Sequence, residues 1–89
     1  MEYENALIPF GEAVSDARPN TLSWDRCDAG DNEYGEYCYY GVIYDPATDE
    51  VVYFTPAWSL KSLVGNSVVR WMEDNGYAYN EQSWEWNKA

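Results

Sequence analysis

Residues 36–55 read EYCYYGVIYDPATDEVVYFT, and this stretch decides the fold. Two runs rich in Val, Ile, Tyr and Phe, at 36–45 and 50–55, flank the segment PATD. β-Branched and aromatic residues favour strands, whereas Pro and Asp favour turns, so the stretch predicts an antiparallel hairpin. Side chains alternate along the first run, and both of its faces carry large side chains. Cys38, Tyr40, Val42 and Tyr44 lie on one face, and Tyr37, Tyr39 and Ile43 lie on the other. One face is expected to be core and the other partly exposed tyrosine, unless both are covered.

The flanking segments extend this sheet. Upstream, TLSWDRC (21–27) alternates weakly and is expected to pair with 36–44 across DAGDNE (28–33). Downstream, YAYNEQSWEW (77–86) reads as a last strand, with Trp84 and Trp86 on one face, which we expect to lie in the core. The N-terminal residues predict a short helical turn before Pro9 and another around 11–17, ended by the Arg18-Pro19 pair.

Between the strands, SLKSLVGNSVVRWMEDNG (59–76) has the periodicity of an amphipathic helix. Its apolar stripe is formed by Leu60, Leu63, Val64, Val68, Trp71 and Met72. Ser59 is the expected N-cap and Gly76 the expected C′ residue, which predicts a helix over about 60–75. Gly65 is expected to permit close approach to the sheet. The chain is therefore predicted to be a single α+β domain over 1–89, an antiparallel sheet of three to four strands with one amphipathic helix packed on a face.

The charge of the chain is its outlying feature. Sixteen Asp and Glu against five Lys and Arg give a net charge of −11, and no His is present. Residues 1–56 hold twelve acids and two bases (net −10), whereas 57–89 hold four acids and three bases (net −1). Apolar residues make up 46% of the chain and aromatic residues 18%, which excludes a disordered acidic tail. The negative electrostatic field of this net charge repels nucleic acid and anionic membranes and attracts a basic surface.

The inventory of residues argues against catalysis. Without His there is no His-based triad and no His metal ligand, and neither GxGxxG nor a Walker A sequence occurs. We expect no enzyme activity, no cofactor and no metal. A twelve-residue calcium loop starting at Asp25 would put Gly30 and Glu36 at its sixth and twelfth positions, but Cys27 and Ala29 then stand where side-chain oxygens are needed.

Two further features bear on the compartment. The sequence shows no secretory signal and no apolar run of the length that a membrane span needs, so a cytoplasmic location is expected. Cys27 and Cys38 are expected to be reduced and half-buried, because a small secreted scaffold usually has more cysteines. A cross-strand disulfide between them stays open as an alternative.

Acids and tyrosines together predict a protein-binding surface. In extended chain, charges two or three residues apart lie roughly 6–10 Å apart, a spacing comparable with backbone phosphates. Tyrosine brings large area with a polar tip and is common among binding hot spots. The candidate partner-binding residues are Asp25, Asp28, Asp31, Glu33, Tyr34, Glu36, Tyr37, Asp45, Asp49 and Glu50.

In size, charge and aromatic content the chain resembles the small acidic inhibitors that viruses encode, such as DNA mimics, anti-restriction and anti-CRISPR proteins, and uracil-DNA glycosylase inhibitors. The resemblance implies a phage protein that acts in the host cytoplasm on a basic nucleic-acid-binding partner, namely a nuclease, CRISPR effector or repair enzyme. Direct binding to nucleic acid or membrane is not expected. Two alternatives remain, an immunity protein or antitoxin that neutralises a basic nuclease, and a non-catalytic phage structural or accessory module that self-associates.

Overall fold

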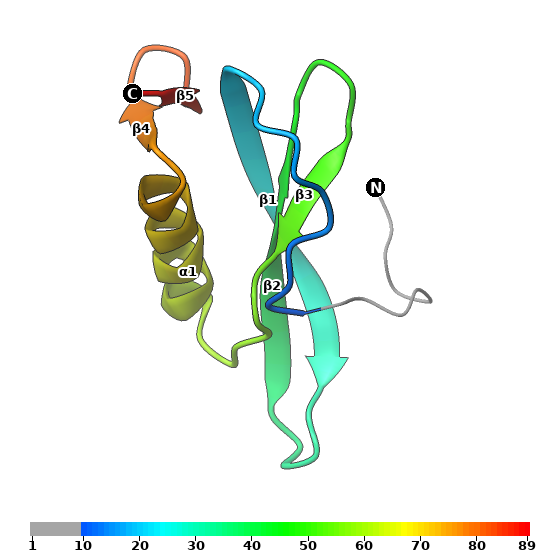
Figure 1. Cartoon of the computed structure of the whole chain (residues 1–89). Helices are drawn as coiled ribbons and strands as arrows, with labels where there is room; N and C mark the ends of the chain where they lie inside the picture. Colours follow the sequence, from blue (N-terminus) through cyan, green and yellow to red (C-terminus); the bar gives the residue numbers. More distant parts are fainter. Residues whose placement is uncertain (1–9) are drawn as a thin grey trace.

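The computed structural model describes residues 10–89, which form one five-stranded sheet and one helix (Figure 1). In chain order the elements are β1 (Thr21–Asp31), β2 (Tyr37–Tyr44), β3 (Val51–Phe54), α1 (Lys61–Asp74), β4 (Tyr77–Asn80) and β5 (Glu85–Lys88). The sheet order is β3-β2-β1-β5-β4, and every pairing is antiparallel. The predicted α+β class is confirmed, with a strand count slightly above the three to four expected.

The predicted meander is present, but its first strand is longer than expected. β1 pairs with β2 from Ser23 opposite Tyr44 to Asp31 opposite Tyr37, with a bulge between Asp28 and Gly30. Residues 25–31 are therefore extended and cannot wrap around a calcium ion. Within residues 10–89 no group of three or more acids and cysteines is placed to hold a metal ion.

The cysteines occupy different levels of this ribbon. Cys27 lies opposite Tyr40 and Cys38 lies opposite Gly30, and both thiols are free. The two cysteines therefore do not face each other in this register, and the disulfide alternative is wrong. Burial raises the pKa of the Cys27 thiol, and the neighbouring carboxylates of Asp25 and Asp28 raise it further, against a lowering hydrogen bond with Tyr40. A raised pKa keeps this thiol protonated near neutrality.

Both faces of β2 are covered over residues 40–43, whereas Tyr37 is exposed and Tyr39 is half-buried, so the strand combines the two arrangements that its alternation allows. One cluster fills the space between the sheet and α1 and contains Leu22, Ile43, Val52, Val68, Met72, Tyr77 and Trp86. On the opposite face Tyr40, Val42 and Phe54 form a smaller cluster. The helix buries a narrower stripe than predicted, since Val64, Val68 and Met72 are buried while Leu60 is 58% exposed.

Close approach between helix and sheet depends on Gly41 and not, as predicted, on Gly65. A Cβ built on Gly65 would meet no atom within 4 Å. A Cβ on Gly41 would lie 2.9 Å from Val68 Cγ2, 3.2 Å from Thr55 Cγ2 and 3.3 Å from Val64 Cγ1. The glycine that admits the helix is therefore in β2.

The helix ends agree with the sequence at one end only. Leu60, with extended backbone and no side-chain cap, is the N-cap, so the prediction of Ser59 was one residue early. At the other end Asn75 is the C-cap, and Gly76 follows in the left-handed region at φ +83°, as expected for C′. No helix in the described part of the chain is long and apolar enough to cross a membrane.

The segment before β1 is an extended strap and not the helical turn predicted at 11–17. Gly11 N–H donates to Phe54 O at 2.8 Å, and Val14 N–H donates to Val52 O at 2.9 Å. The strap thus runs along the outer edge of β3. The helical turn predicted before Pro9 lies outside the described residues.

The expected last strand is a hairpin. β4 and β5 pair from Tyr77 opposite Lys88 to Asn80 opposite Glu85, and residues 81–84 form the turn. Trp86 is buried, as predicted for this residue. Trp84 is 79% exposed with φ +61°, so its prediction as a core residue was wrong. The turn ends the alternation that the sequence suggested.

Candidate protein-binding surface

The ten candidate residues fall into separate groups. Residues 31–37, which we call the hairpin tip, join β1 to β2 and project at the bottom of Figure 1. Six candidates lie in or next to this tip, namely Asp28, Asp31, Glu33, Tyr34, Glu36 and Tyr37. The other acids, Asp45, Asp49 and Glu50, lie in and beside the β2–β3 turn at the opposite end of the ribbon, as the predicted hairpins require. Asp25 lies in β1 opposite Val42, away from both turns.

A single side chain organises the turn of the tip. Asn32 Oδ1 accepts the backbone N–H groups of Tyr34 at 2.9 Å and Glu36 at 3.0 Å. Asn32 N–H donates to Glu36 O at 2.8 Å, and Gly35, at φ +76°, donates to Asn32 O at 3.0 Å. Asn side chains stabilise turns by this local bonding, and Gly supplies the positive φ. The turn therefore presents Tyr34, which is 79% exposed, on an ordered backbone.

The tyrosines continue along one face of the ribbon. The rings of Tyr37 and Tyr39 meet edge to face with centroids 5.4 Å apart, and the strand residues opposite them are Asp31 and Asp28. Partial desolvation raises the pKa of Tyr37, and the charge and hydrogen bond of Asp28 raise it further. The Tyr37 hydroxyl is therefore neutral near pH 7 and donates to a carboxylate. Lys61 Nζ lies 5.3 Å from the centroid of the Tyr39 ring, beyond the tyrosine pair.

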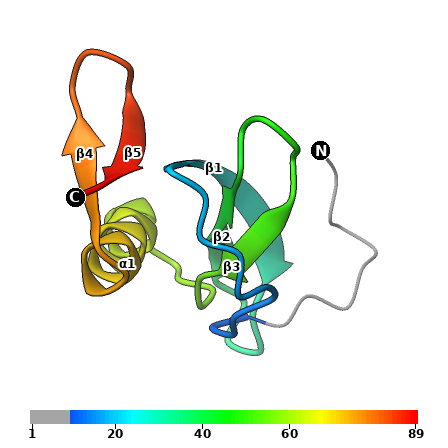
Figure 2. The same cartoon turned by 45° about the horizontal axis from the view of Figure 1, so that its top comes forward.

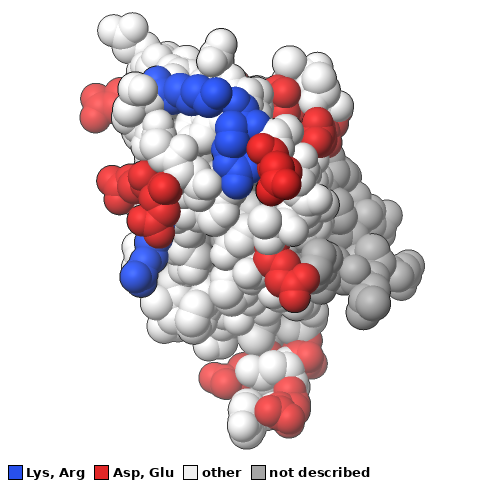
Figure 3. Space-filling model, in the orientation of Figure 1, with Lys and Arg blue, Asp and Glu red and all other residues white. Residues whose placement is uncertain are grey.

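The acids are not neutralised within the described chain. Across residues 10–89 no Lys or Arg side chain forms an ion pair with Asp or Glu at 4.0 Å or less. Arg18 donates instead to the carbonyls of Ser15 and Ala17 and to Asn75 Oδ1. On the face shown in Figure 3 the lower projection carries red side chains and no blue ones. The negative potential of the tip is thus open to solvent.

A hollow of about 250 Å³ lies at the base of the tip. Its lining residues are Phe10, Ala29, Gly30, Asp31, Asn32, Cys38 and Ala57. The walls are mainly apolar, and Asp31 supplies one carboxylate. Lys and Arg bury an aliphatic stem along apolar surface while the charged head stays solvated or paired. The hollow therefore has the chemistry to receive a basic side chain from a partner.

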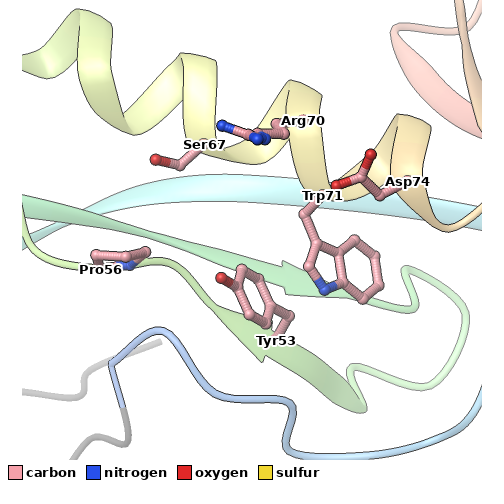
Figure 4. A pocket seen from close by; sticks show the side chains of 6 residues that line it. All are labelled: Tyr53, Pro56, Ser67, Arg70, Trp71 and Asp74. Atoms are coloured by element: carbon pink, nitrogen blue, oxygen red, sulfur yellow. The ribbon is translucent and has the colours of Figure 1, made fainter.

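A second hollow, of about 280 Å³, lies between α1 and the end of β3 (Figure 4). It is lined by Tyr53, Pro56, Ser67, Arg70, Trp71 and Asp74. The Ser67 hydroxyl is already engaged, since it accepts from Trp58 Nε1 and donates to Leu63 O, both at 2.9 Å. Arg70 and Asp74 carry opposite charges, so this hollow does not extend the acidic surface.

Sequence reasoning found the charged and aromatic residues of the tip but missed the residues that shape it. Asn32 had a signal, because Asn followed three residues later by Gly is typical of a turn. The apolar walls at Ala29 and Ala57 had none, since they come from segments brought together only by the fold. No protein family, curated protein or solved structure matches the chain. The chemistry of the surface is therefore the basis for assigning a function.

Proposed function

We propose that this protein is a stoichiometric inhibitor that presents its hairpin tip to the positively charged nucleic-acid-binding groove of another protein. The observation that carries the proposal is the composition of the tip. Residues 31–37 contain three carboxylates and two tyrosines without a base, and every one of them is exposed. Because no described cation pairs with these acids, the arginines and lysines of a partner are the matching groups.

The mode of action follows from composition and shape. The hydrogen-bonded turn holds Asp31, Glu33 and Glu36 together at the end of one projection, so their carboxylates form an anionic group that a phosphate-binding groove can receive. Tyr34 adds a large exposed ring at the end of the projection, and Tyr37 adds another on its side. The hollow beside Asp31 takes one Lys or Arg stem. The inhibitor acts by occupying the groove, without catalysis or cofactor.

Affinity capture with matched baits tests the proposal. The tip variant is Asp31→Asn with Glu33→Gln and Glu36→Gln, and the control variant is Glu12→Gln with Glu73→Gln and Glu81→Gln. Each replaces three exposed acids, so both change the net charge from −11 to −8. At low salt, wild type and control are expected to recover a basic nucleic-acid-binding protein from a prokaryotic lysate, whereas the tip variant loses it.

The recovered partner is then purified and its nucleic-acid binding is titrated with each bait. One equivalent of wild type is expected to displace nucleic acid, and affinity for the partner is expected to fall steeply with salt. If both variants lost affinity equally, binding would depend on the net charge of the whole protein and not on the hairpin tip. Recovery of no nucleic-acid-binding protein by any bait would end the proposal, and a partner that is itself a basic toxin would assign the immunity role.

A further inference from the structure

Beyond its first residues, β1 has a neighbouring strand on one side only. It pairs with β5 at Thr21 and Leu22 alone, and β2 is its other neighbour in the sheet. Figure 2 shows the β4–β5 hairpin beside the start of β1, while the rest of the strand runs away from it. Among residues 10–89 no other strand or bridge pairs with residues 23–31 on this side. The longest strand of the sheet therefore has an open edge.

Backbone hydrogen bonds of β2 establish which residues of β1 face this edge. In an antiparallel pair, residues opposite each other direct their N–H and C=O groups either toward each other or both away. Gly41 directs both groups away from β1, since its N–H donates to Thr55 Oγ1 at 2.8 Å and its carbonyl accepts Thr55 N–H at 2.9 Å. Arg26 lies opposite Gly41, so the N–H and C=O of Arg26 point out from the open edge.

The residues two positions away on either side repeat this orientation. Tyr39 exchanges both of its backbone hydrogen bonds with Trp58, at 2.7 and 2.8 Å, and it lies opposite Asp28. Trp24 has the same orientation as Arg26, because the pattern alternates along the strand. Trp24, Arg26 and Asp28 thus present three N–H and three C=O groups that have no hydrogen-bond partner in the described part of the chain.

The side chains along this edge select the kind of strand that it accepts. Charged residues on a strand edge prevent unspecific pairing. Here Asp25, Asp28 and Asp31 outnumber the one base, Arg26, and all four are exposed. An acidic strand, including that of a second copy of this chain of net charge −11, is repelled, and a neutral strand would have to desolvate the carboxylates. A strand that carries lysine or arginine pairs with these acids and is favoured.

We infer that the open edge of β1 binds an extended basic segment of the partner protein as an added strand of the sheet. The inference rests on the proposed function, and it adds a backbone contact to the charge contact of the hairpin tip. The edge leads directly into the tip, because β1 ends at Asp31, where the tip begins. One partner can therefore pair a strand with β1 and receive the tip in its groove. In strand addition the backbone hydrogen bonds supply affinity and alternate side chains supply specificity.

A peptide probe tests the edge without the natural partner. The probe is a short capped peptide in which lysine alternates with valine. In one control peptide glutamate replaces lysine, and in the other every backbone nitrogen is methylated, which keeps the charge and removes the backbone donors. With the lysine peptide, amide hydrogen exchange measured by NMR is expected to slow at Trp24, Arg26 and Asp28. Asp25 and Cys27, whose N–H groups face β2, are expected to change little, and neither control peptide is expected to protect the edge.

Matched variants measure the contribution of charge to this contact. Asp25→Asn with Asp28→Asn, and the control Glu73→Gln with Glu81→Gln, each remove two acids and change the net charge from −11 to −9. The edge variant is expected to bind the lysine peptide about fivefold more weakly, whereas the control binds it as wild type does. Equal binding of the lysine and N-methylated peptides, or protection confined to residues 33–36, overturns the inference.

The same amides separate this inference from the proposed function. In a complex with a captured nucleic-acid-binding protein, protection at Trp24, Arg26 and Asp28 supports both. Protection of the tip alone in that complex retains the proposed function and overturns the strand addition. Addition of the lysine peptide to β1, together with failure to capture any nucleic-acid-binding protein, supports the edge as a site for basic strands and ends the proposed function.

Discussion

Gly41 shows how one residue sets the distance between two layers. Its position in β2 faces α1, where Val64 and Val68 are fully buried and would stand within 3.3 Å of any Cβ at residue 41. Thr55 completes this contact, because its buried hydroxyl accepts Gly41 N–H at 2.8 Å and donates to Pro56 O at 2.9 Å. The missing side chain and the threonine hydroxyl together let the helix settle on the sheet.

Replacing each of two glycines by alanine separates the effect of helix–sheet packing from the effect of helix propensity. Gly41→Ala is expected to lower the free energy of unfolding by about 1–3 kcal/mol, because the new methyl overlaps the helix side chains. Gly65→Ala, in the helix interior with no atom within 4 Å of its Cβ, is expected to raise it by about 0.5–1 kcal/mol. Urea denaturation measures both. Opposite signs are required, and a neutral Gly41→Ala would refute the close approach.

Tyr77 makes stability sensitive to alkaline pH. Its hydroxyl donates to Pro19 O, and burial raises its pKa, with a lowering contribution from Arg18 and a raising one from Asp45. Since the folded state holds this proton more tightly than the unfolded chain, the stabilisation is complete below about pH 10 and is lost as pH rises through the raised folded pKa. Tyr77→Phe is expected to show a smaller loss of unfolding free energy between about pH 9 and 11.

Tyr53 is another group of this kind, since burial raises its pKa as well. Tyr53→Phe is therefore expected to remove a further part of the alkaline loss, and the double variant is expected to remove more of it than either single variant. Denaturant titrations at each pH, with tyrosinate absorbance recorded in parallel, follow both quantities. An alkaline transition that is unchanged in the double variant would show that other groups control it.

Among the elements, the strap over residues 11–18 depends on one side chain. Arg18 donates to Ser15 O, Ala17 O and Asn75 Oδ1, and its guanidinium carbon lies 4.9 Å from the centroid of the Trp71 ring. The same indole stacks on Tyr53 of β3 at 5.2 Å. Arg18 therefore ties the strap to the end of α1 and, through Trp71, to the strand whose edge the strap covers.

Arg18→Met keeps the stem and removes the bonds. We expect the free energy of unfolding to fall by about 1–3 kcal/mol, since the lost hydrogen bonds involve a charged donor. Amide exchange should accelerate at Gly11 and Val14, whose N–H groups bind β3. Arg26→Met, an exposed residue of β1, is the matched control and is expected to change stability by less than about 0.5 kcal/mol. Unchanged exchange at Val14 would contradict the role of Arg18.

The elements also show where sequence reasoning succeeds. The central hairpin and the helix were predicted because β-branched runs and a 3.6-residue period are local signals. The strap was predicted wrongly as a helical turn, because its hydrogen bonds go to β3 carbonyls that no local pattern reveals. At 77–86 the sequence predicted strand structure correctly but missed the turn between β4 and β5, because the residue with positive φ in that turn is Trp84 and not a glycine. The acids and tyrosines of the tip could be predicted from the sequence. The hollow could not, because its lining residues come from segments that only the fold brings together.

At the scale of the whole molecule, the acidic hairpin tip and the uncharged strand β4 lie far apart. The described protein measures 39 × 23 × 20 Å, with the hairpin tip at one end and the β4–β5 hairpin toward the other (Figure 1). The tip carries unpaired acids, and β4 is the uncharged edge.

The same electrostatics governs folding. With a net charge of −11 and no ion pair among residues 10–89, screening removes repulsion and sacrifices no attractive pair. Raising NaCl from about 0.01 to about 0.15 M shortens the Debye length from about 30 to about 8 Å and is expected to raise Tm by a few degrees. Calorimetry measures the shift.

A variant with a smaller net charge tests whether charge repulsion causes this salt dependence of Tm. Glu12→Lys with Glu73→Lys makes two changes of +2 and brings the net charge from −11 to −7, at exposed positions away from the tip and β4. Its Tm is expected to exceed that of wild type at low salt and to respond less to added NaCl, because less repulsion remains to be screened. A Tm that falls with salt in wild type would mean that attractive charge pairs dominate the fold. The tip acids would then be explained by internal stability, without a basic partner.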